Sequence, residues 1–382
     1  MDRELLESTL KGLAAIGPRP HGSQANVAAL SYIEDELTSL GMTVVSEPFS
    51  APAPQLRADT ELLIDGVATD CVPFLESAPG CVDGQLRKAP NCLIWGMHDT
   101  EVWRVRARNG DTAIIAVPPF PTAVQQHLPP EFDGVPSVLM SRSDATDRGI
   151  DTGTSARVTI ATPLLEAQSR CLRAFWGDAD PLGDERSEIH PIVVAHIDTV
   201  PETPGVYDNA AGVAAALSVA ATNTSPGYEI LITSGEEEGL AGARAFVRRL
   251  GGISRLGRLS AAIVLDGGGR GRIAEAWLSS NLDEKIVRHH VRAITDARNY
   301  QAEFRQPAPP ASDHAAFIEA GVSAVMFTVN DLDILHTSQD TYEESKLLGS
   351  RLLAELAEEF LSFPGTFLSS NHSEQRKVQS HE

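Results

Sequence analysis

The sequence predicts an α/β fold: a three-layer sandwich around a mostly parallel but mixed central sheet, with an inserted, mostly β domain. Three observations predict it. From residue 191 onward, short apolar segments alternate with helical ones, as in a sheet covered by helices. From about residue 51 to 162, short β-rich pieces alternate with Pro- and Gly-rich turns. Finally, 382 residues are too many for one ordinary core, so two domains are expected.

The first fifty residues predict two amphipathic helices and a strand. The first helix is indicated by four leucines at helical spacing, namely Leu5, Leu6, Leu10 and Leu13. The turn-forming segment GPRPHGS at 17–23 ends it. A second helix is expected from about residue 24 to 40, because Gly41 follows as a typical stop signal. Residues 42–45 then predict a strand.

The middle region predicts an inserted domain of short strands. Its apolar pieces are ELLIDG, NCLIWG, TAIIAV, PSVLMS and ARVTIA. Helical periodicity is weak there except over 98–110 (HDTEVWRVRARNG), where a helix is expected. The predicted division is a discontinuous α/β domain at 1–50 and 163–366, an inserted β-rich domain at 51–162, and a polar tail at 367–382 that is expected to be disordered.

The C-terminal half predicts buried strands and the helices between them. PIVVAH, YEILIT, AAIVLD and SAVMFT are short runs rich in β-branched residues, as expected for strands covered on both faces. Helices are expected at 210–221, 239–250 and 281–297, and a last amphipathic helix at 341–360.

Charge and cysteine content exclude several classes of protein. With 31 basic and 52 acidic residues the formal net charge is −21, which makes nucleic acid a poor partner. No run of eighteen apolar residues predicts a membrane span, and the N-terminus lacks the pattern of a secretory signal. Four cysteines without CxxC spacing are expected to be reduced thiols, which favours a cytoplasmic location: Cys71, Cys81, Cys92 and Cys171.

Acidic or histidine side chains follow each of the four strands of the C-terminal half. They are His196 and Asp198 with Asp208, then Glu236 to Glu238, then Asp266, and finally His336. Singly, such residues are often helix caps or complements of a helix dipole. Strand ends of an α/β sheet meet at one edge, however, and acids crowded there repel one another unless a cation is present. Two histidines and at least three carboxylates therefore predict a metal site.

These motifs resemble the co-catalytic zinc aminopeptidases of the M28 metallopeptidase family. The order and spacing of HIDTV, DNAAG, GEEEGLAGARAF, LDGGG, SDHAAF and LHTSQDT match from about residue 192 to 344. The segment IGPRPHGSQANVAALSYIEDELTSLG is similar to the opening of such chains. The β-rich stretch is placed like the protease-associated insert of some members. The resemblance makes the α/β domain the catalytic domain.

The resemblance also implies two Zn²⁺ ions per chain, or other divalent metals, and a ligand set. His196 and Asp266 would bind one ion, Glu237 and His336 the other, and Asp208 would bridge them, followed by a cis peptide bond to Asn209. Asp198 is implied as a catalytic residue that hydrogen-bonds the free nitrogen of His196 and fixes its tautomer. Asp340 is expected to act similarly near His336.

The resemblance further implies the roles in the run of three glutamates. The family pattern Glu-Glu-x-Gly-Leu-x-Gly aligns so that Glu236 is the general base and Glu237 the ligand, with Glu238 at the variable position. A hydroxide that bridges the metals would attack the N-terminal peptide bond, and Glu236 would pass the proton to the leaving amine. The expected activity is a zinc-dependent aminopeptidase acting on short peptides or amino-acid conjugates.

Several residue roles and alternative functions remain open. Some members place a tyrosine just before the last histidine, where this chain has Leu335, so the oxyanion donor is unassigned. His314 is expected to support or line the site, and Tyr207 is expected to pack.

A carboxypeptidase or dipeptidase would need a cationic pocket for the substrate carboxylate. The candidate residues for such a pocket are Arg244, Arg270, Arg272 and Arg305. A glutaminyl-cyclase-like transferase or an inactive binding protein are further alternatives. Neither a nucleic-acid nor a membrane partner is expected, and a homodimer stays open.

Overall fold

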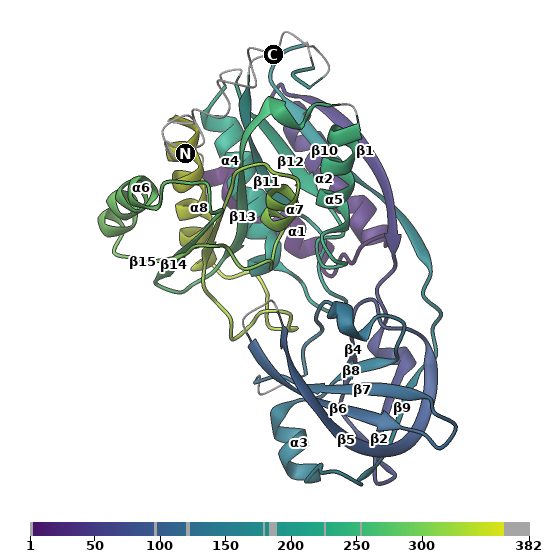
Figure 1. Cartoon of the computed structure of the whole chain (residues 1–382). Helices are drawn as coiled ribbons and strands as arrows, with labels where there is room; N and C mark the ends of the chain where they lie inside the picture. The colour runs from purple at the N-terminus through teal and green to yellow at the C-terminus, as the bar shows by residue number, and fades with distance from the viewer. Residues whose placement is uncertain are drawn as a thin grey trace.

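Two eight-stranded sheets organise the chain (Figure 1). The computed structural model describes residues 3–94, 98–119, 123–178, 180–182, 189–224, 227–252 and 254–362. One sheet carries helices on both faces and forms the upper body in Figure 1, while the other lies below it.

The first sheet is mixed, in the order β1-β10-β12-β11-β13-β16-β14-β15. Four of its seven pairings are parallel, namely β11 with β12 and with β13, β13 with β16, and β14 with β15. Its strands are β1 (Thr43–Pro52), β10 (Glu166–Phe175), β11 (His190–His196), β12 (Glu229–Thr233), β13 (Leu259–Gly268), β14 (Ile273–Leu278), β15 (Gln301–Arg305) and β16 (Ala324–Val329). The central strands β11 and β12 are buried throughout, as strands covered on both faces must be.

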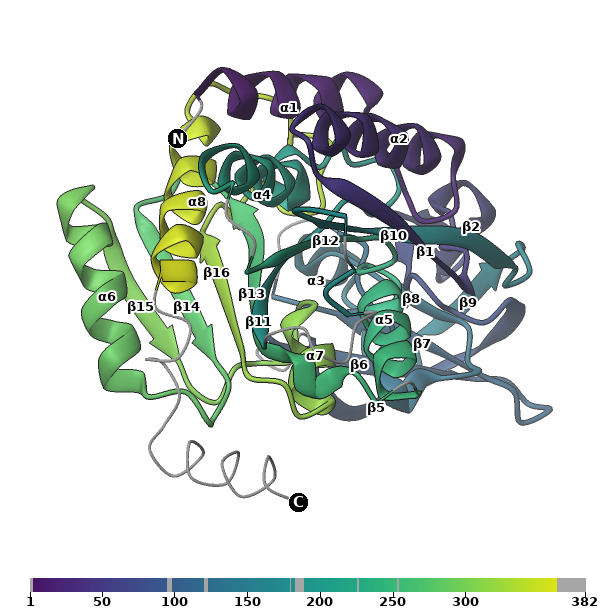
Figure 2. The ribbon, with the colours of Figure 1, turned by 90° about the horizontal axis from the view of Figure 1, so that it is seen from above.

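Helices cover both faces of this sheet (Figure 2). One face packs against α1 (Arg3–Ile16), α2 (Gln24–Ser39), α4 (Ala211–Thr222), α6 (Glu284–Ala297) and α8 (Lys346–Ser362). The other face packs against α5 (Ala241–Gly252) and α7 (His314–Glu319). Helix α4 is apolar and buried on nearly all sides, because it lies between the sheet and other helices.

Gly212 allows α4 to approach the sheet closely. A Cβ at this position would lie 2.2 Å from the Leu265 carbonyl oxygen, so any larger residue would push the helix away from β13. The close approach places the start of α4 beside the end of β13. It thereby brings Asp208 toward Asp266.

The second sheet lies between β1 and β10 in the sequence. Its order is β3-β2-β9-β5-β6-β7-β8-β4, and one short helix, α3 (Arg142–Arg148), follows β8. Its strands are β2 (Thr60–Ile64), β3 (Val67–Thr69), β4 (Val72–Pro73), β5 (Gly80–Ile94), β6 (His98–Arg106), β7 (Thr112–Val117), β8 (Ser137–Leu139) and β9 (Ser155–Ile160). Because β1 and β10 pair antiparallel along their whole length, the inserted region leaves and re-enters the first sheet at one place. Single 3₁₀ turns occur at Arg57–Asp59, Pro130–Phe132 and Leu256–Arg258.

The predicted fold class is confirmed, and one predicted element is wrong. Residues 98–106 form the strand β6 and not a helix, because they pair with β5 and β7 and bury Val102, Trp103 and Val105. The last helix begins at Lys346, five residues later than expected, and β14 and β15 were not predicted. The predicted domain boundaries stay a prediction, and the tail at 367–382 lies outside the described residues. Every helix in the described ranges is too short or too polar to cross a bilayer.

The packing of α7 against α5 can be tested by substitution. Phe317 is fully buried, and its ring lies 6.3 Å from that of Phe246 on α5. Replacing it with alanine removes about 3–5 kcal/mol from the free energy of unfolding, because the cavity left behind cannot collapse fully. Leu348→Ala is the control, since this side chain is 51% exposed and its loss should cost under about 0.5 kcal/mol. Urea unfolding measures both, and equal effects of the two substitutions would contradict the packing.

Candidate metal centre

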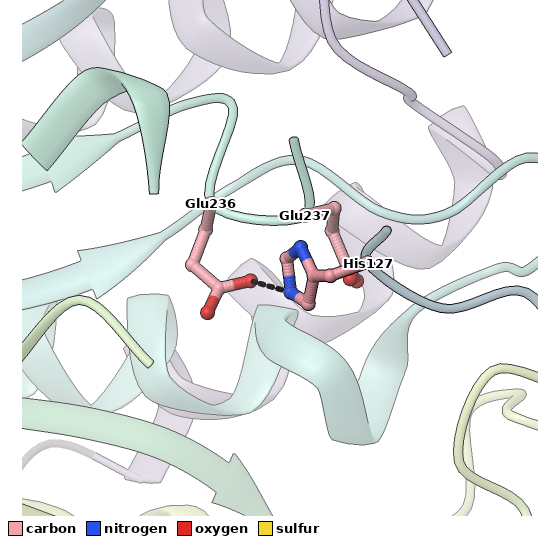
Figure 3. A group of neighbouring side chains, drawn as sticks. All are labelled: His127, Glu236 and Glu237. Atoms are coloured by element: carbon pink, nitrogen blue, oxygen red, sulfur yellow. Dashed lines mark ion pairs between the residues drawn. The ribbon is translucent and has the colours of Figure 1, made fainter. Parts of the chain in front are cut away.

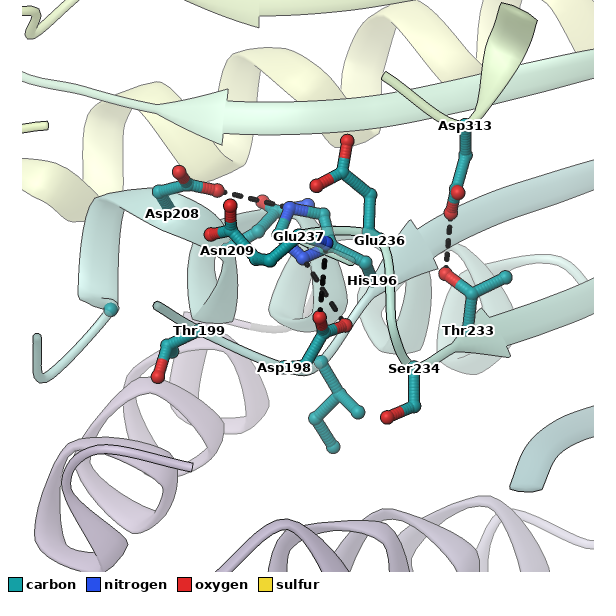
Figure 4. A network of polar contacts seen from close by, with 12 residues as sticks. His196, Asp198, Thr199, Asp208, Asn209, Thr233, Ser234, Glu236, Glu237 and Asp313 are labelled. Atoms are coloured by element: carbon teal, nitrogen blue, oxygen red, sulfur yellow. Dashed lines mark hydrogen bonds and ion pairs between the residues drawn. The ribbon is translucent and has the colours of Figure 1, made fainter. Parts of the chain in front are cut away.

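The predicted site residues gather at the carboxyl edge of the first sheet, and Figure 4 shows His196, Asp198, Asp208, Glu236 and Glu237 among them. His196 ends β11, Asp266 lies near the end of β13, and Glu236 and Glu237 follow β12. Asp208 lies in the turn Val206–Ala210 before α4, where its backbone is not helical, and its peptide bond to Asn209 is cis as expected. His336 follows β16 in a loop. The structure therefore brings all five predicted ligands and the predicted base into one cluster.

Two groups of possible ligands share Asp208. The Nε2 atom of His196 lies 2.9 Å from Asp208 Oδ1 and 3.4 Å from Asp266 Oδ1. On the other side, His336 Nε2 lies 3.0 Å from Asp208 Oδ2 and 3.3 Å from Glu237 Oε2. Each triad could hold one ion. Asp208 offers one oxygen to each triad, which is the arrangement that a bridging carboxylate requires.

The buried polar atoms of the site fit a metal. Neither nitrogen of His196 makes a hydrogen bond within the described residues, nor does Glu237 Oε1, although all three atoms are buried. His336 donates from Nδ1 to the Gln125 carbonyl oxygen at 2.7 Å, so in the neutral ring Nε2 carries a lone pair toward two carboxylates. A proton on Nε2 or a metal cation between these atoms removes the repulsion of the lone pair and the carboxylate oxygens. Imidazole nitrogens and carboxylate oxygens are ligands that zinc binds.

The charges of the cluster also favour a bound cation. Burial raises the pKa of Glu236 well above its ordinary value, and the carboxylates of Glu237 and Asp266 add to this effect against the opposing His196. Burial lowers the pKa of His336, but Glu237 and Asp208 outweigh it and raise the pKa. Burial also raises the pKa of Glu237. The two glutamates thus lack enough positive charge nearby, and a divalent cation would supply it.

Asn209 joins the two strand ends that carry ligands. Its side-chain amide donates to the Leu265 carbonyl at 2.8 Å, and its Oδ1 accepts from the backbone N–H groups of Gly212 and Gly267. These bonds tie the turn before α4 to the end of β13. They fix Asp208 relative to Asp266.

Arg19 holds the loop that lies between His196 and Asp208. Its side chain is fully buried and donates to the carbonyl oxygens of Ile197, Pro204 and Gly205 at 2.5, 2.7 and 2.7 Å. Burial lowers the pKa of Arg19 to about 10, so the guanidinium is still charged near neutral pH. The GPRP segment, which the sequence marked as a helix stop, thus supports the site.

Two predicted supporting contacts differ from expectation. Asp198 Oδ1 lies 3.7 Å from His196 Nδ1, which is longer than a hydrogen bond, while Asp198 Oδ2 accepts from the Glu237 backbone N–H at 3.2 Å. Asp340 accepts from the backbone N–H groups of Tyr207 and Asp208 and from the buried ammonium of Lys346, so it holds the turn that carries Asp208. Gln125 takes the predicted place of Asp340 beside His336.

The SDH motif contributes through its serine. Ser312 donates to Asp266 Oδ2 at 2.5 Å, and Asp313 accepts from Thr233. His314 points away from the ligands, since its Nε2 bonds the Pro309 carbonyl and its ring contacts Trp277. Sequence reasoning singled out His314 and missed Ser312, because spacing alone does not tell which residue of a motif faces the site.

A cavity of about 270 Å³ lies beside the cluster. Its acidic wall consists of Asp208, Glu236, Glu237 and Asp266. Apolar and aromatic side chains also line the cavity, including Tyr207, Trp277, Met326, Leu332 and Leu335. Tyr207 is buried and also lines this cavity, so it both packs and faces the site.

The inserted region adds two histidines to this cavity, His98 and His127. His127 lies between Glu236 and Glu237 in Figure 3, and its Nε2 atom is 4.0 Å from Glu236 Oε2. No pattern in the sequence marks either residue, because the contact depends on how the second sheet packs over the first.

Comparisons with known proteins found a matching family model and several similar structures. Residues 182–361 match the family model described as Peptidase family M28. An aminopeptidase from Aneurinibacillus sp. strain AM-1 has a similar structure with a TM-score of 0.68, at 20% identity over 94% of this chain and 93% of that one. BSAP, a zinc aminopeptidase from Bacillus subtilis, has a TM-score of 0.68 at 19% identity over 94% and 95% of the two chains. At these identities the likenesses show the fold.

One curated relative shares part of the sequence. The vacuolar membrane protease of Aspergillus clavatus is 34% identical over 126 residues. This match covers 31% of the present chain and 12% of the relative, so the chain spans only a small part of the relative's length.

The Arg19 contacts predict a loss of both stability and metal binding on substitution. Arg19→Met leaves the Ile197 and Pro204 carbonyl oxygens without this donor, while the Gly205 carbonyl keeps only the Ala210 N–H. The free energy of unfolding should fall by about 3 kcal/mol or more. The loosened loop should also release metal at lower chelator concentrations. Chemical unfolding and a chelator titration measure these effects, with Arg3→Met as the control because Arg3 is 75% exposed. Unchanged metal retention in Arg19→Met would show that the loop does not depend on Arg19.

Proposed function

Since the chain belongs to peptidase family M28 through residues 182–361, we propose that this metallopeptidase is a zinc-dependent aminopeptidase that acts on short peptides or amino-acid conjugates. The observation that carries the proposal is the pair of ligand triads sharing Asp208, with Glu236 facing the same cavity. His196 and Asp266 would hold one ion, Glu237 and His336 the other, and Asp208 both. Bound zinc would polarise the scissile carbonyl and lower the pKa of the attacking water.

Glu236 is suited to move the proton. It lies in neither triad that shares Asp208, although it forms a third group of possible ligands with His127 and Glu237, and it lines the same cavity. A general base has to reach the attacking water without being a ligand, and a place beside the two triads suits that role. Its raised pKa makes its carboxylate a stronger base toward the proton of that water.

The charge of the cavity favours an aminopeptidase over a carboxypeptidase. Of the four candidate arginines only Arg305 is among the described lining residues, and its Nε donates to Glu275 at 2.7 Å. Arg270 pairs with Asp331 and Glu343, and Arg244 with Glu319. Two zinc ions would be balanced by the four carboxylates of the acidic wall. The cavity then offers no excess positive charge for a substrate carboxylate, which counts against a carboxypeptidase.

The remaining alternatives receive less support. An inactive binding protein or a cyclase with one metal would not need two intact triads. Both triads are present, and the proposed base Glu236 is buried beside them. Cytoplasmic location and oligomeric state stay predictions.

The test is a panel of aminoacyl-nitroanilides, their N-blocked analogues and peptides with free or amidated C-termini. We expect cleavage only where the substrate amine is free. Glu236→Gln should lower kcat by at least about 10²-fold while the metal content stays at the wild-type value, because the variant loses the proton carrier and keeps the ligands.

Glu238→Gln is the matched control. Glu238 is the adjacent buried carboxylate, but it does not appear in the described cavity lining, so its variant should keep kcat within about tenfold of the wild type. Cleavage that requires a free C-terminal carboxylate would move the assignment to a carboxypeptidase. Full activity in Glu236→Gln would contradict the assigned base.

A further inference from the structure

The inserted region places one histidine within the catalytic cavity. His127 lies on the segment 123–129 of the inserted region, and it lines the cavity together with Glu236 and Glu237 (Figure 3). Its side chain is 23% exposed, so one edge of the ring faces the cavity while the rest is covered. No motif of the sequence assigns it a role.

One hydrogen bond fixes the tautomer of His127. The backbone N–H of Gly239 donates to His127 Nδ1 at 3.2 Å. Because Nδ1 accepts, the proton of the neutral ring resides on Nε2. Burial lowers the pKa of His127 to about 4, which agrees with a neutral ring near pH 7. The Nε2–H group points toward Glu236 at 4.0 Å, beyond hydrogen-bond distance.

Most other side-chain donors around the cavity already have acceptors. Trp277, Arg305 and Asn330 all donate to Glu275. Thr328 donates to the Gly267 carbonyl at 3.1 Å. The position before His336 is Leu335, which offers no donor. The Nε2–H group of His127 is therefore well placed for a substrate oxygen.

We propose that His127 donates a hydrogen bond from Nε2 to the scissile carbonyl oxygen as that oxygen gains negative charge. This inference rests on the proposed peptidase function and makes His127 a catalytic residue of that reaction. The carbonyl carbon would lie near Glu236, whose water attacks it, and His127 lies beside Glu236. A preorganised donor of this kind stabilises the transition state more than the bound substrate.

The segment that carries His127 is fixed to both parts of the protein. The Gln125 carbonyl accepts from His336 at 2.7 Å, and the Gln125 side chain donates to the Gln55 carbonyl at 2.7 Å. The Leu75 backbone N–H donates to the Gln126 carbonyl at 3.0 Å. These bonds hold His127 in place before substrate binds. The inserted region thus completes the active site as well as covering it.

The test compares His127→Ala and His127→Gln with the wild type on one aminoacyl-nitroanilide. His127→Ala should lower kcat by about 10²–10³-fold and change KM by less than about threefold, because the lost bond strengthens only in the transition state. His127→Gln should recover most of this loss, since the glutamine amide can donate from a similar position. A tetrahedral phosphinate analogue should bind His127→Ala more weakly by the same factor as kcat/KM.

Three controls separate this role from others. His289→Ala removes an exposed histidine on α6 and should match the wild type. Metal content should be unchanged in both His127 variants, and loss of an ion would make His127 a ligand and overturn the proposal. Unchanged kcat in His127→Ala, or no rescue by glutamine, would also overturn it while wild-type turnover still supports the peptidase function. No turnover by the wild type on any substrate would overturn both.

Discussion

The structure depends on the placement of several buried carboxylates and two imidazoles at one sheet edge. Asp208 lies 2.9 Å from one histidine and 3.0 Å from the other, and Glu236, Glu237 and Asp266 surround them. Such a group is costly to bury unless a cation balances it. The ends of the strands and the loops after them place these side chains so that two adjacent cations could balance their charge.

The surrounding structure holds the ligands through backbone contacts. Asp340 accepts from the N–H groups of Tyr207 and Asp208, and Lys346 on α8 offsets its charge from a fully buried position. Arg19 binds three carbonyl oxygens of the loop before Asp208. Because each support acts on the backbone, the carboxylate of Asp208 keeps both oxygens for the two histidines.

The sequence predicted the α/β architecture and the clustering of the five ligands because both depend on local patterns. Buried strands read as apolar runs, and their carboxyl ends must share an edge. Prediction from the sequence failed where the conformation or position of a segment depends on contacts with distant segments. The strand β6 has helix-like spacing, yet pairing with β5 and β7 decides its conformation. Gln125 and His127 reach the site only because the inserted sheet packs there, and no periodicity records that contact.

The most direct test of the shared Asp208 is the number of zinc ions per chain, measured by native mass spectrometry on the zinc-loaded protein. The arrangement of the two triads predicts two ions in the wild type. It also predicts weaker retention of both ions in Asp208→Asn, because one carboxylate serves both positions. One ion or none in the wild type, or loss of a single ion in the variant with the other retained at full affinity, would contradict the shared-ligand account.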